Sequence, residues 1–424
     1  MAHFGVLCPP LEGHLGPMIA LSRELFHRRH RITFFSIPDA EARIAKEGLD
    51  FHTIGFSDWP IGSLAQVLQP VGKSSGVSGF RATLRAYQRL METVYREVPP
   101  AIKTLGIEML ITDQTERIGR TIAEVTGTPF ITVCNAMALN REIEIPPFFT
   151  LWNYKQTWRA RIRNQFGYQL YDRLSKPMQD TINAYRREQG LPQHHIVDNS
   201  FSPLAQISQQ PKGFDFPRTN LPRSFHYVGP MRTSEPASIP FPYKKLTGQP
   251  LIYASIGTIQ SRSIGIFHTI AEACTEQNVQ LILSLGGNLS VDDLTPLPGN
   301  PIVVQYAPQA ELLNRAKLCI THAGLNTTLE ALTHGVPLIA IPITNDQPGV
   351  AARIAYTGTG EVIPLKKLNS SDLRKVIERV LTQNSYRQAA LRMGDQIQQS
   401  GGVTRAADIV EEVTSTMSVA SLRK

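Results

Sequence analysis

Short apolar runs alternate with segments of helical periodicity along the first half of the chain. The runs typical of strands are residues 3–8, 31–36, 109–112 and 130–133. Apolar residues recur at helical spacing at Met18, Leu21 and Leu25, and further helical segments are predicted over residues 39–47 and 118–125. Strands that alternate with helices in this way predict a parallel sheet with helices on both faces.

The same alternation restarts after a proline-rich segment, residues 231–250. Apolar runs at 251–256, 279–284, 302–304, 318–321 and 338–341 predict a second sheet, and helical segments at 371–381, 385–399 and 405–417 close the chain. We therefore predict an α/β protein with two doubly wound, Rossmann-like domains, 1–230 and 251–424, joined by a linker at 231–250. The domains should face each other across a central cleft, and the terminal helices could pack back on the first domain.

Two stretches lack periodicity, residues 56–79 and 140–154, and both are predicted to be long loops above the cleft. A basic stretch follows at residues 155–187, with arginines interleaved among aromatic residues. This pattern is typical of a solvated amphipathic helix. Alternatively, the stretch could lie against anionic lipid headgroups, which attract each nearby Lys or Arg.

Composition narrows the class of protein. The 424 residues are 42% hydrophobic and 18% charged, which is typical of soluble globular proteins and excludes a mainly disordered or fibrous chain. The formal net charge of +8 favours anionic partners in general without indicating nucleic acid. The four cysteines are widely spaced in apolar segments, so we expect buried thiols. Neither a signal peptide nor a membrane span is visible, so we expect a cytoplasmic protein, with any membrane contact peripheral on the inner face.

Known phosphate-binding signatures are missing from the loops that follow the first strand of each domain. These loops read CPPLEGHLGP and SIGTIQSRS, without G-x-G-x-x-G, and G-x-x-x-x-G-K-[ST] occurs nowhere. Dinucleotide oxidoreductases and phosphate-loop ATPases are therefore disfavoured. Neither Asp-x-Asp nor a cluster with metal-ligand spacing occurs, so we predict no metal site, and protein groups would have to neutralise a bound phosphate.

A candidate anion site lies where a predicted strand meets a helix, in the segment THAGLNTTLEAL at residues 321–332. Gly324 permits a tight turn, and the helix should begin near Asn326 or Thr327, so that its free N–H groups and its dipole favour an anion. His322 could add a donor, and Glu330 could accept hydrogen bonds from a ribose. The alternative is an ordinary capped helix with Glu330 on its solvated face.

A candidate catalytic pair lies at the cleft edge of the first predicted sheet. His14 follows the first strand, and Asp113 ends the run 109–113. A carboxylate that holds a histidine fixes one imidazole tautomer and stabilises the protonated ring, which a general base for a hydroxyl needs. The alternative for His14 is an exposed loop residue without a chemical role.

Four segments read together closely resemble the signature of the UDP-dependent glycosyltransferases of plants and bacteria, family 1 of the glycosyltransferases. They are Tyr306-Ala-Pro-Gln309, Thr321-His-Ala-Gly-Leu-Asn-Thr-Thr-Leu-Glu330, His334-Gly-Val-Pro337 and Asp346-Gln347. The resemblance implies the two-domain GT-B fold. It also implies a nucleotide sugar such as UDP-glucose bound by residues 251–424, an acceptor bound by residues 1–230, and neither a metal nor another cofactor.

Carried over by position, the family implies roles for individual side chains of the second domain. Tyr306 would stack on the uracil, Gln309 and Glu330 would hold the ribose, and His322, Asn326 and Thr327 would hold the diphosphate. Asp346 and Gln347 would bind the sugar hydroxyls, Thr258 would lie near the phosphates, and Ser284 would meet the edge of the base. Plant members carry Trp at the position of Tyr306, so a smaller ring would stack here.

A narrower similarity, in residues 201–209, 215–218, 228–230 and 346–354, is to the bacterial zeaxanthin glucosyltransferases of carotenoid pathways. It implies transfer of glucose to a hydroxyl of a lipophilic acceptor, such as a carotenoid or another terpenoid, to give a β-glucoside. Met137, Phe148, Phe149 and Trp152 are the candidate walls for this acceptor, although they could be ordinary core. A macrolide, phenolic or sterol-like acceptor stays open, as does a non-catalytic nucleotide-sugar-binding protein.

Overall fold

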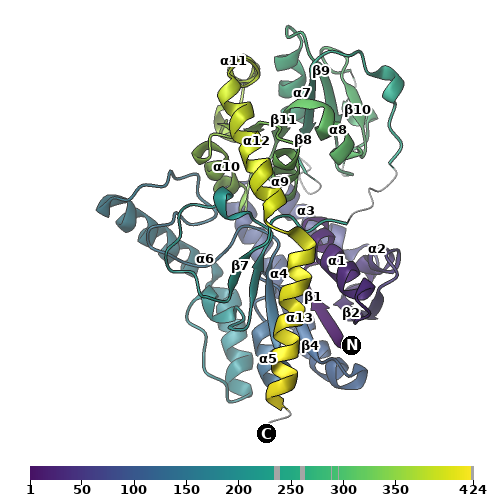
Figure 1. The fold of residues 1–424 in the computed structure, drawn as a ribbon, viewed down its shortest axis with the longest axis vertical. Coiled ribbons are helices and arrows are strands. Elements are labelled where there is room, and N and C mark those ends of the chain that lie inside the picture. Colours follow the sequence, from purple (N-terminus) through teal and green to yellow (C-terminus); the bar gives the residue numbers. More distant parts are fainter. Residues whose placement is uncertain (234–238, 258–262, 288, 295, 422–424) are drawn as a thin grey trace.

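Two parallel sheets form the framework of the computed structural model, which describes residues 1–233, 239–257, 263–287, 289–294 and 296–421 (Figure 1). The first sheet contains β1 (His3–Leu7), β2 (Arg31–Ser36), β3 (Asp50–Thr53), β4 (Met109–Asp113), β5 (Phe130–Cys134), β6 (Gln206–Ser208) and β7 (Phe225–Tyr227). The second contains β8 (Leu251–Ser255), β9 (Gln280–Ser284), β10 (Ile302–Val304), β11 (Ala316–Thr321), β12 (Leu338–Ala340) and β13 (Gly360–Val362). Their orders are β3-β2-β1-β4-β5-β6-β7 and β10-β9-β8-β11-β12-β13. The predicted α/β class with two parallel sheets is confirmed.

Helices cover both faces of each sheet. Those that follow strands of the first sheet are α1 (Glu12–His27), α2 (Glu41–Ala45), α3 (Ser63–Gly72), α4 (Gly76–Leu105), α5 (Gly119–Thr126) and α6 (Trp158–Glu188). The later ones are α7 (Ser263–Cys274), α8 (Gln309–Arg315), α9 (Leu325–Thr333), α10 (Gln347–Tyr356), α11 (Ser370–Thr382), α12 (Asn384–Gln399) and α13 (Gly402–Ser421). In β4, Met109 and Ile111 join the core beneath α1, whereas Leu110 joins the core beneath α4 and α5. This alternation explains the near-continuous apolar runs, because strands buried on both faces have no polar side.

The C-terminal helix returns to the first sheet. Ala406, Ile409 and Val410 of α13 pack in the same core cluster as α1, and Figure 1 shows α13 running along the first domain. The chain changes direction at Gly401 and Gly402, where φ is 87° and 55°, and the Gly402 N–H donates to the Val228 carbonyl at 2.6 Å. A left-handed pair of residues of this kind favours glycine. Residues 231–250, expected to be a linker, connect β7 with β8.

The prediction of a loop over residues 56–79 was wrong in part. This segment contains α3 and the first turn of α4, a helix of 30 residues. Leu64, Val67, Leu68 and Val71 are spaced as one helical face, but Gly62, Pro70 and Gly72 obscured that pattern. The second predicted loop, 140–154, contains neither helix nor strand in the structure. Strands β3, β6, β7 and β13 were also not predicted, because these short strands mix polar with apolar residues, whereas the equally short β10 and β12 are wholly apolar.

Candidate active site

His14 and Asp113 meet at the carboxyl edge of the first sheet. Strands β1 and β4 are parallel neighbours, with Leu7 paired to Thr112, so the residues that follow them emerge at the same edge. His14 lies in the first turn of α1 rather than in a loop, and its Nδ1 lies 2.7 Å from Asp113 Oδ2. Three further hydrogen bonds hold the Asp113 carboxylate, from Asn135 Nδ2 and from the N–H and hydroxyl of Thr115. Since Nδ1 is engaged, Nε2 is the nitrogen left for a substrate.

Opposing effects set the pKa of this pair. Burial lowers the pKa of His14, but the Asp113 carboxylate and the hydrogen bond to it raise that pKa more, to a net value above the ordinary 6.5. Burial likewise opposes ionisation of Asp113, yet His14 and the Thr115 donors hold the Asp113 pKa below its usual range. Asp113 therefore stays a carboxylate at neutral pH and can stabilise a protonated His14. Glu116, buried close by, has its pKa raised to about 8 by burial and by the Asp113 charge, so it is mostly neutral at pH 7.

The start of α9 faces the His14–Asp113 pair from the second sheet. Strands β8 and β11 are parallel neighbours, with Ser255 paired to Thr321, which brings Gly257 and His322 together. The imidazole of His322 fits between two glycines: a Cβ atom on Gly257 or Gly324 would lie 2.7 or 2.5 Å from its Nε2. Burial lowers the pKa of His322 to about 4, so this ring is neutral at pH 7. It can donate one hydrogen bond to an anion but supplies no charge.

Asn326 joins the two domains. Its Nδ2 donates to the Gly13 carbonyl at 2.9 Å, and its Oδ1 accepts a hydrogen bond from Gln209 at 2.7 Å. Helix α9 begins at Leu325 after Gly324, within two residues of the predicted start. Gly324, Asn326 and Thr327 all line the same cavity as His14. The N-terminus of α9 and the candidate base therefore open into one space.

The residues expected around the uridine lie away from this cavity, at the same edge of the second sheet. Gln309 donates to Glu330, and the Tyr253 hydroxyl donates to Gln309 Oε1 at 3.1 Å. Ser284 is buried at the end of β9. Tyr306 is 54% exposed, and its hydroxyl lies so close to Gly287 that a Cβ atom there would be 2.0 Å from it. The structure thus joins Gln309 with Glu330 and leaves the Tyr306 ring accessible. Thr258 lies outside the described residues.

Asp346 and Gln347 begin α10 and line the cavity beside His14. Asp346 Oδ2 accepts a hydrogen bond from the Met137 N–H at 3.3 Å, and Gln347 Oε1 accepts from the N–H groups of Ile343 and Thr344 at 2.8 and 3.0 Å. Burial raises the pKa of Asp346. Both side chains are therefore held in place by backbone groups and present their remaining polar atoms to the cavity.

The cavity itself has a volume of about 390 Å³ and is mostly apolar on the side of the first domain. Of the predicted acceptor walls, Phe148 lines it. The other three do not: Met137 is buried in the core of the second domain, Phe149 stacks behind Phe80, and Trp152 packs under α6 against Gly167. The side chains that form the wall instead come mainly from α3, α4 and α6. They include Trp59, Leu64, Val67, Leu68, Val71, Phe80, Leu84, Tyr87, Leu90, Tyr171 and Met178.

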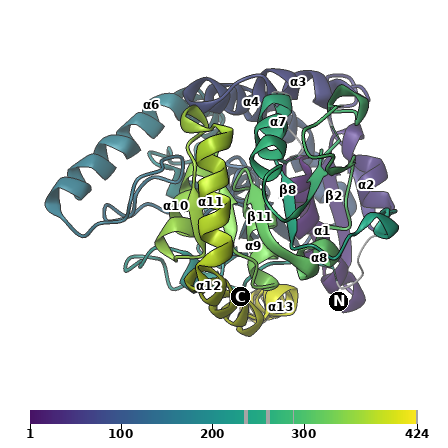
Figure 2. The ribbon, with the colours of Figure 1, turned by 90° about the horizontal axis from the view of Figure 1, so that it is seen from above.

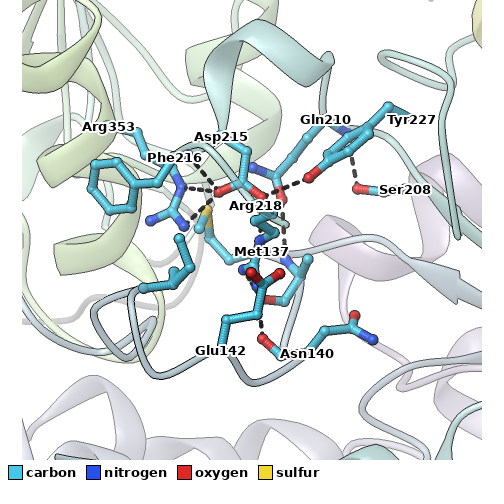
Figure 3. Close-up of polar contacts among 12 residues, drawn as sticks. Met137, Asn140, Glu142, Ser208, Gln210, Asp215, Phe216, Arg218, Tyr227 and Arg353 are labelled. Atoms are coloured by element: carbon cyan, nitrogen blue, oxygen red, sulfur yellow. Dashed lines mark hydrogen bonds and ion pairs between the residues drawn. The ribbon is translucent and has the colours of Figure 1, made fainter. Parts of the chain in front are cut away.

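Sequence reasoning also missed one polar residue of the cavity, Arg117, and one polar contact between the domains, that of Asp215. Arg117 lines the cavity at 5% exposure, donates to Gln179, and has no carboxylate within ion-pair distance among the described residues. Asp215 contacts helix α10 from the first domain: its Oδ1 accepts from Arg353 Nε and Nη2 at 2.8 and 2.6 Å, and its Oδ2 accepts from Arg218 at 2.7 Å (Figure 3). The spacing of these residues in the sequence gives no sign of either contact.

The described residues contain neither a cluster of metal ligands nor a membrane-spanning helix. In that part of the chain, no three or more His, Cys, Asp or Glu side chains are grouped as ligands for a metal ion. No helix within it is long and apolar enough to cross a bilayer.

Two facing α/β domains, with the start of a helix opposite a histidine–aspartate pair, define the GT-B fold class. Comparison with solved structures agrees: the glycotransferase of kitacinnamycin superposes with a TM-score of 0.77 at 20% identity, over 97% of this chain and 98% of that one. The calicheamicin glycosyltransferase CalG4 superposes with a TM-score of 0.71 over 98% of both chains.

Sequence comparison identifies the family. The profile of the UDP-glucoronosyl and UDP-glucosyl transferases matches residues 108–399. A zeaxanthin glucosyltransferase from Pantoea ananas is 36% identical over 98% of this chain and 97% of its own length, and one from Pseudescherichia vulneris is 32% identical over 97% and 98%. This chain belongs to that family and is a family 1 glycosyltransferase that uses a UDP-sugar.

Proposed function

We propose that the protein transfers glucose from UDP-glucose to a hydroxyl group of a lipophilic acceptor, a carotenoid such as zeaxanthin or a related terpenoid alcohol. The observation that carries this proposal is the shared cavity, in which His14 faces the N-terminus of α9 and the start of α10 on one side and apolar side chains on the other. The identity of 36% and 32% to two zeaxanthin glucosyltransferases supports the choice of acceptor.

In the proposed reaction, His14 Nε2 takes the proton of the acceptor hydroxyl as its oxygen attacks the anomeric carbon. The bond between that carbon and the diphosphate oxygen breaks, and UDP leaves with the electron pair. Attack from the face opposite the diphosphate inverts the centre, so an α-linked donor yields a β-glucoside. A general base of this kind typically contributes about 10² to 10⁴ in rate.

Other residues would bind or orient the reacting groups. Asp113 would hold the His14 tautomer and offset its positive charge. The backbone N–H groups at the start of α9, with Thr327 and neutral His322, would stabilise the charge that develops on UDP. Because Asn326 is hydrogen-bonded to Gly13 and Gln209, its role would include holding the first turn of α1, which carries His14, against α9. Asp346 and Gln347 would hold the sugar hydroxyls, Tyr306 the uracil, and Gln309 with Glu330 the ribose. Contact of Ser284 with the base edge completes the proposal.

Product analysis tests the proposed function directly. Purified protein with UDP-glucose and zeaxanthin in detergent is expected to release UDP and to give masses higher by one or two glucosyl groups, with β-anomeric signals by nuclear magnetic resonance. A panel of macrolide, phenolic and sterol alcohols run in parallel separates the acceptor classes, because a relative 26% identical to this chain is a demethyllactenocin mycarosyltransferase. Transfer to one of these alcohols and none to zeaxanthin would contradict the carotenoid assignment.

The pH dependence of transfer tests the proposed base. Neutral His14 is the active form, and its pKa lies above 6.5, so kcat/KM for the acceptor should rise with pH through a midpoint above 6.5. In Asp113→Asn the carboxylate that raises this pKa is lost while burial, which lowers it, remains. The midpoint should therefore move to lower pH, although Asp346 and Glu116 still raise it, and the plateau rate should fall by roughly 10² or more. An unchanged midpoint in Asp113→Asn would contradict the assignment of His14 as the base.

A further inference from the structure

Helix α6 carries large apolar side chains on its outward face. Trp158, Ile162 and Phe166 are 67%, 59% and 63% exposed, and their spacing of four residues places them on one side of the helix. We call these three residues the α6 stripe. The buried residues of the same turns, Ala160, Asn164 and Gly167, lie on the opposite side. The stripe is therefore not the core-facing side of an ordinary amphipathic helix, because other residues of α6 form the side that faces the core.

Basic side chains surround the stripe. Lys155, Arg159, Arg161 and Arg173 are all exposed, and the Arg159 guanidinium lies 5.3 Å from the centre of the Trp158 ring. Arg161 is paired with Glu144 at 3.0 Å, whereas Lys155, Arg159 and Arg173 have no carboxylate within ion-pair distance in the described part of the chain. An apolar strip edged by unpaired cations is typical of helices that lie in the interface of an anionic bilayer.

The position of α6 leaves the stripe accessible. Its N-terminal half projects beyond the rest of the molecule in both views (Figures 1 and 2). The following turns of the same helix supply Tyr171 and Met178 to the wall of the cavity beside His14. One helix thus connects the exposed stripe with the apolar cavity.

We propose that the α6 stripe docks on an anionic lipid bilayer, with Trp158, Ile162 and Phe166 among the headgroups and Lys155, Arg159 and Arg173 against lipid phosphates. The charge around the stripe favours this occupant over a second copy of the chain, since two copies would bring like charges together. The proposal concerns binding alone and holds whichever acceptor the enzyme uses.

Vesicle sedimentation tests the proposal with the full-length protein. The protein is expected to bind vesicles of 60% phosphatidylcholine and 40% phosphatidylglycerol, and to bind pure phosphatidylcholine at least about tenfold more weakly. The change Arg159→Gln with Arg173→Gln should weaken binding to the mixed vesicles about fivefold per residue removed, and raised salt should weaken it further. Replacement of the whole stripe by alanine should weaken binding at least about tenfold.

A matched control removes the same charge elsewhere. Lys366→Gln with Lys367→Gln replaces two exposed cations of the second domain and should leave binding unchanged. All variants should keep the wild-type rate of transfer to an acceptor presented in detergent, which separates failure of docking from failure of the proposed function. Absence of binding to the mixed vesicles, or an equal loss in the Lys366 and Lys367 control, would overturn the proposal. So would a dimer seen by sedimentation velocity that the alanine variant abolishes without any vesicle binding by the wild type.

Discussion

Replacement of His14 by alanine is expected to lower the rate of glucosyl transfer by about 10² to 10⁴ while leaving the affinity for UDP within about twofold of wild type. The alcohol would lose its proton acceptor, because Nε2 is the imidazole nitrogen that Asp113 leaves available. UDP would bind as before, because its proposed contacts lie on the second domain. Single-turnover kinetics with a saturating acceptor and calorimetry with UDP measure the two quantities separately.

A second histidine provides the control for this experiment. His195 is exposed, and its backbone N–H donates to Asn199 Oδ1, whereas its imidazole has no hydrogen-bond partner among the described residues. His195→Ala should therefore retain wild-type turnover. Near wild-type turnover in His14→Ala would exclude His14 as the base. A matching loss of UDP affinity would instead indicate that His14 acts through the structure of the first turn of α1, which Asn326 holds at Gly13.

The sequence pattern was sufficient to predict where the main residues of the site lie, because these residues stand at or just after the ends of strands. His14 follows β1 and Asp113 ends β4, and neighbouring parallel strands bring such positions together in any sheet of this kind. The helix start after β11 was predictable for the same reason, since Gly324 marks the turn and polar residues follow it. These inferences need only the hydrophobic periodicity of the sequence and the direction of the strands.

The acceptor cavity was harder to predict because its walls come largely from helices whose amino-acid composition resembles that of a loop. Leu64, Val67, Leu68 and Val71 have helical spacing, but the glycine and proline residues around them are typical of a loop. Aromatic content drew attention to residues 146–152 instead, where Phe148 reaches the cavity and Trp152 packs beneath α6. Apolar composition alone does not tell a cavity wall from core, since both bury the same side chains.

The sequence around the residues that connect the two domains contains no pattern that predicts these contacts. Asn326 was expected at the diphosphate because of the helix start, yet its partners in the structure are Gly13 and Gln209, which are distant in the sequence. The segments 215–218 and 346–354 were noticed only as points of similarity to other glucosyltransferases. In the structure, Asp215 of the first segment and Arg353 of the second form one ion pair across the domains (Figure 3). These two residues are 138 positions apart in the sequence, and only the folded chain brings them together.

Asp215→Asn is expected to lower the free energy of unfolding by about 3–5 kcal/mol, the usual cost of leaving a buried charge without its partner. The Asp215 carboxylate is 1% exposed and contacts Arg353 and Arg218, whose side chains are 1% and 3% exposed, and it also accepts from the Tyr227 hydroxyl at 2.9 Å. These two guanidiniums hold the pKa of Asp215 well below its usual range against the effect of burial, so the group is charged at neutral pH. Urea unfolding monitored by circular dichroism measures the loss.

The size of the loss should depend on which partner is removed. Arg353→Met should cost less than Asp215→Asn, because Asp215 would keep Arg218 and Tyr227, whereas loss of the carboxylate removes the anion that Arg353 pairs with and leaves Arg218 with Glu142 at 3.7 Å. The exposed pair Arg31–Asp50 supplies a control: Asp50→Asn should change stability by less than about 1 kcal/mol, because its side chain is 52% exposed and water replaces the arginine.

Since Arg353 lies in the helix that begins at Asp346 and Gln347, Asp215→Asn should also raise KM for UDP-glucose without moving the pH midpoint of His14. Equal destabilisation by Asp215→Asn and Asp50→Asn would mean that the buried network does not hold the two domains together.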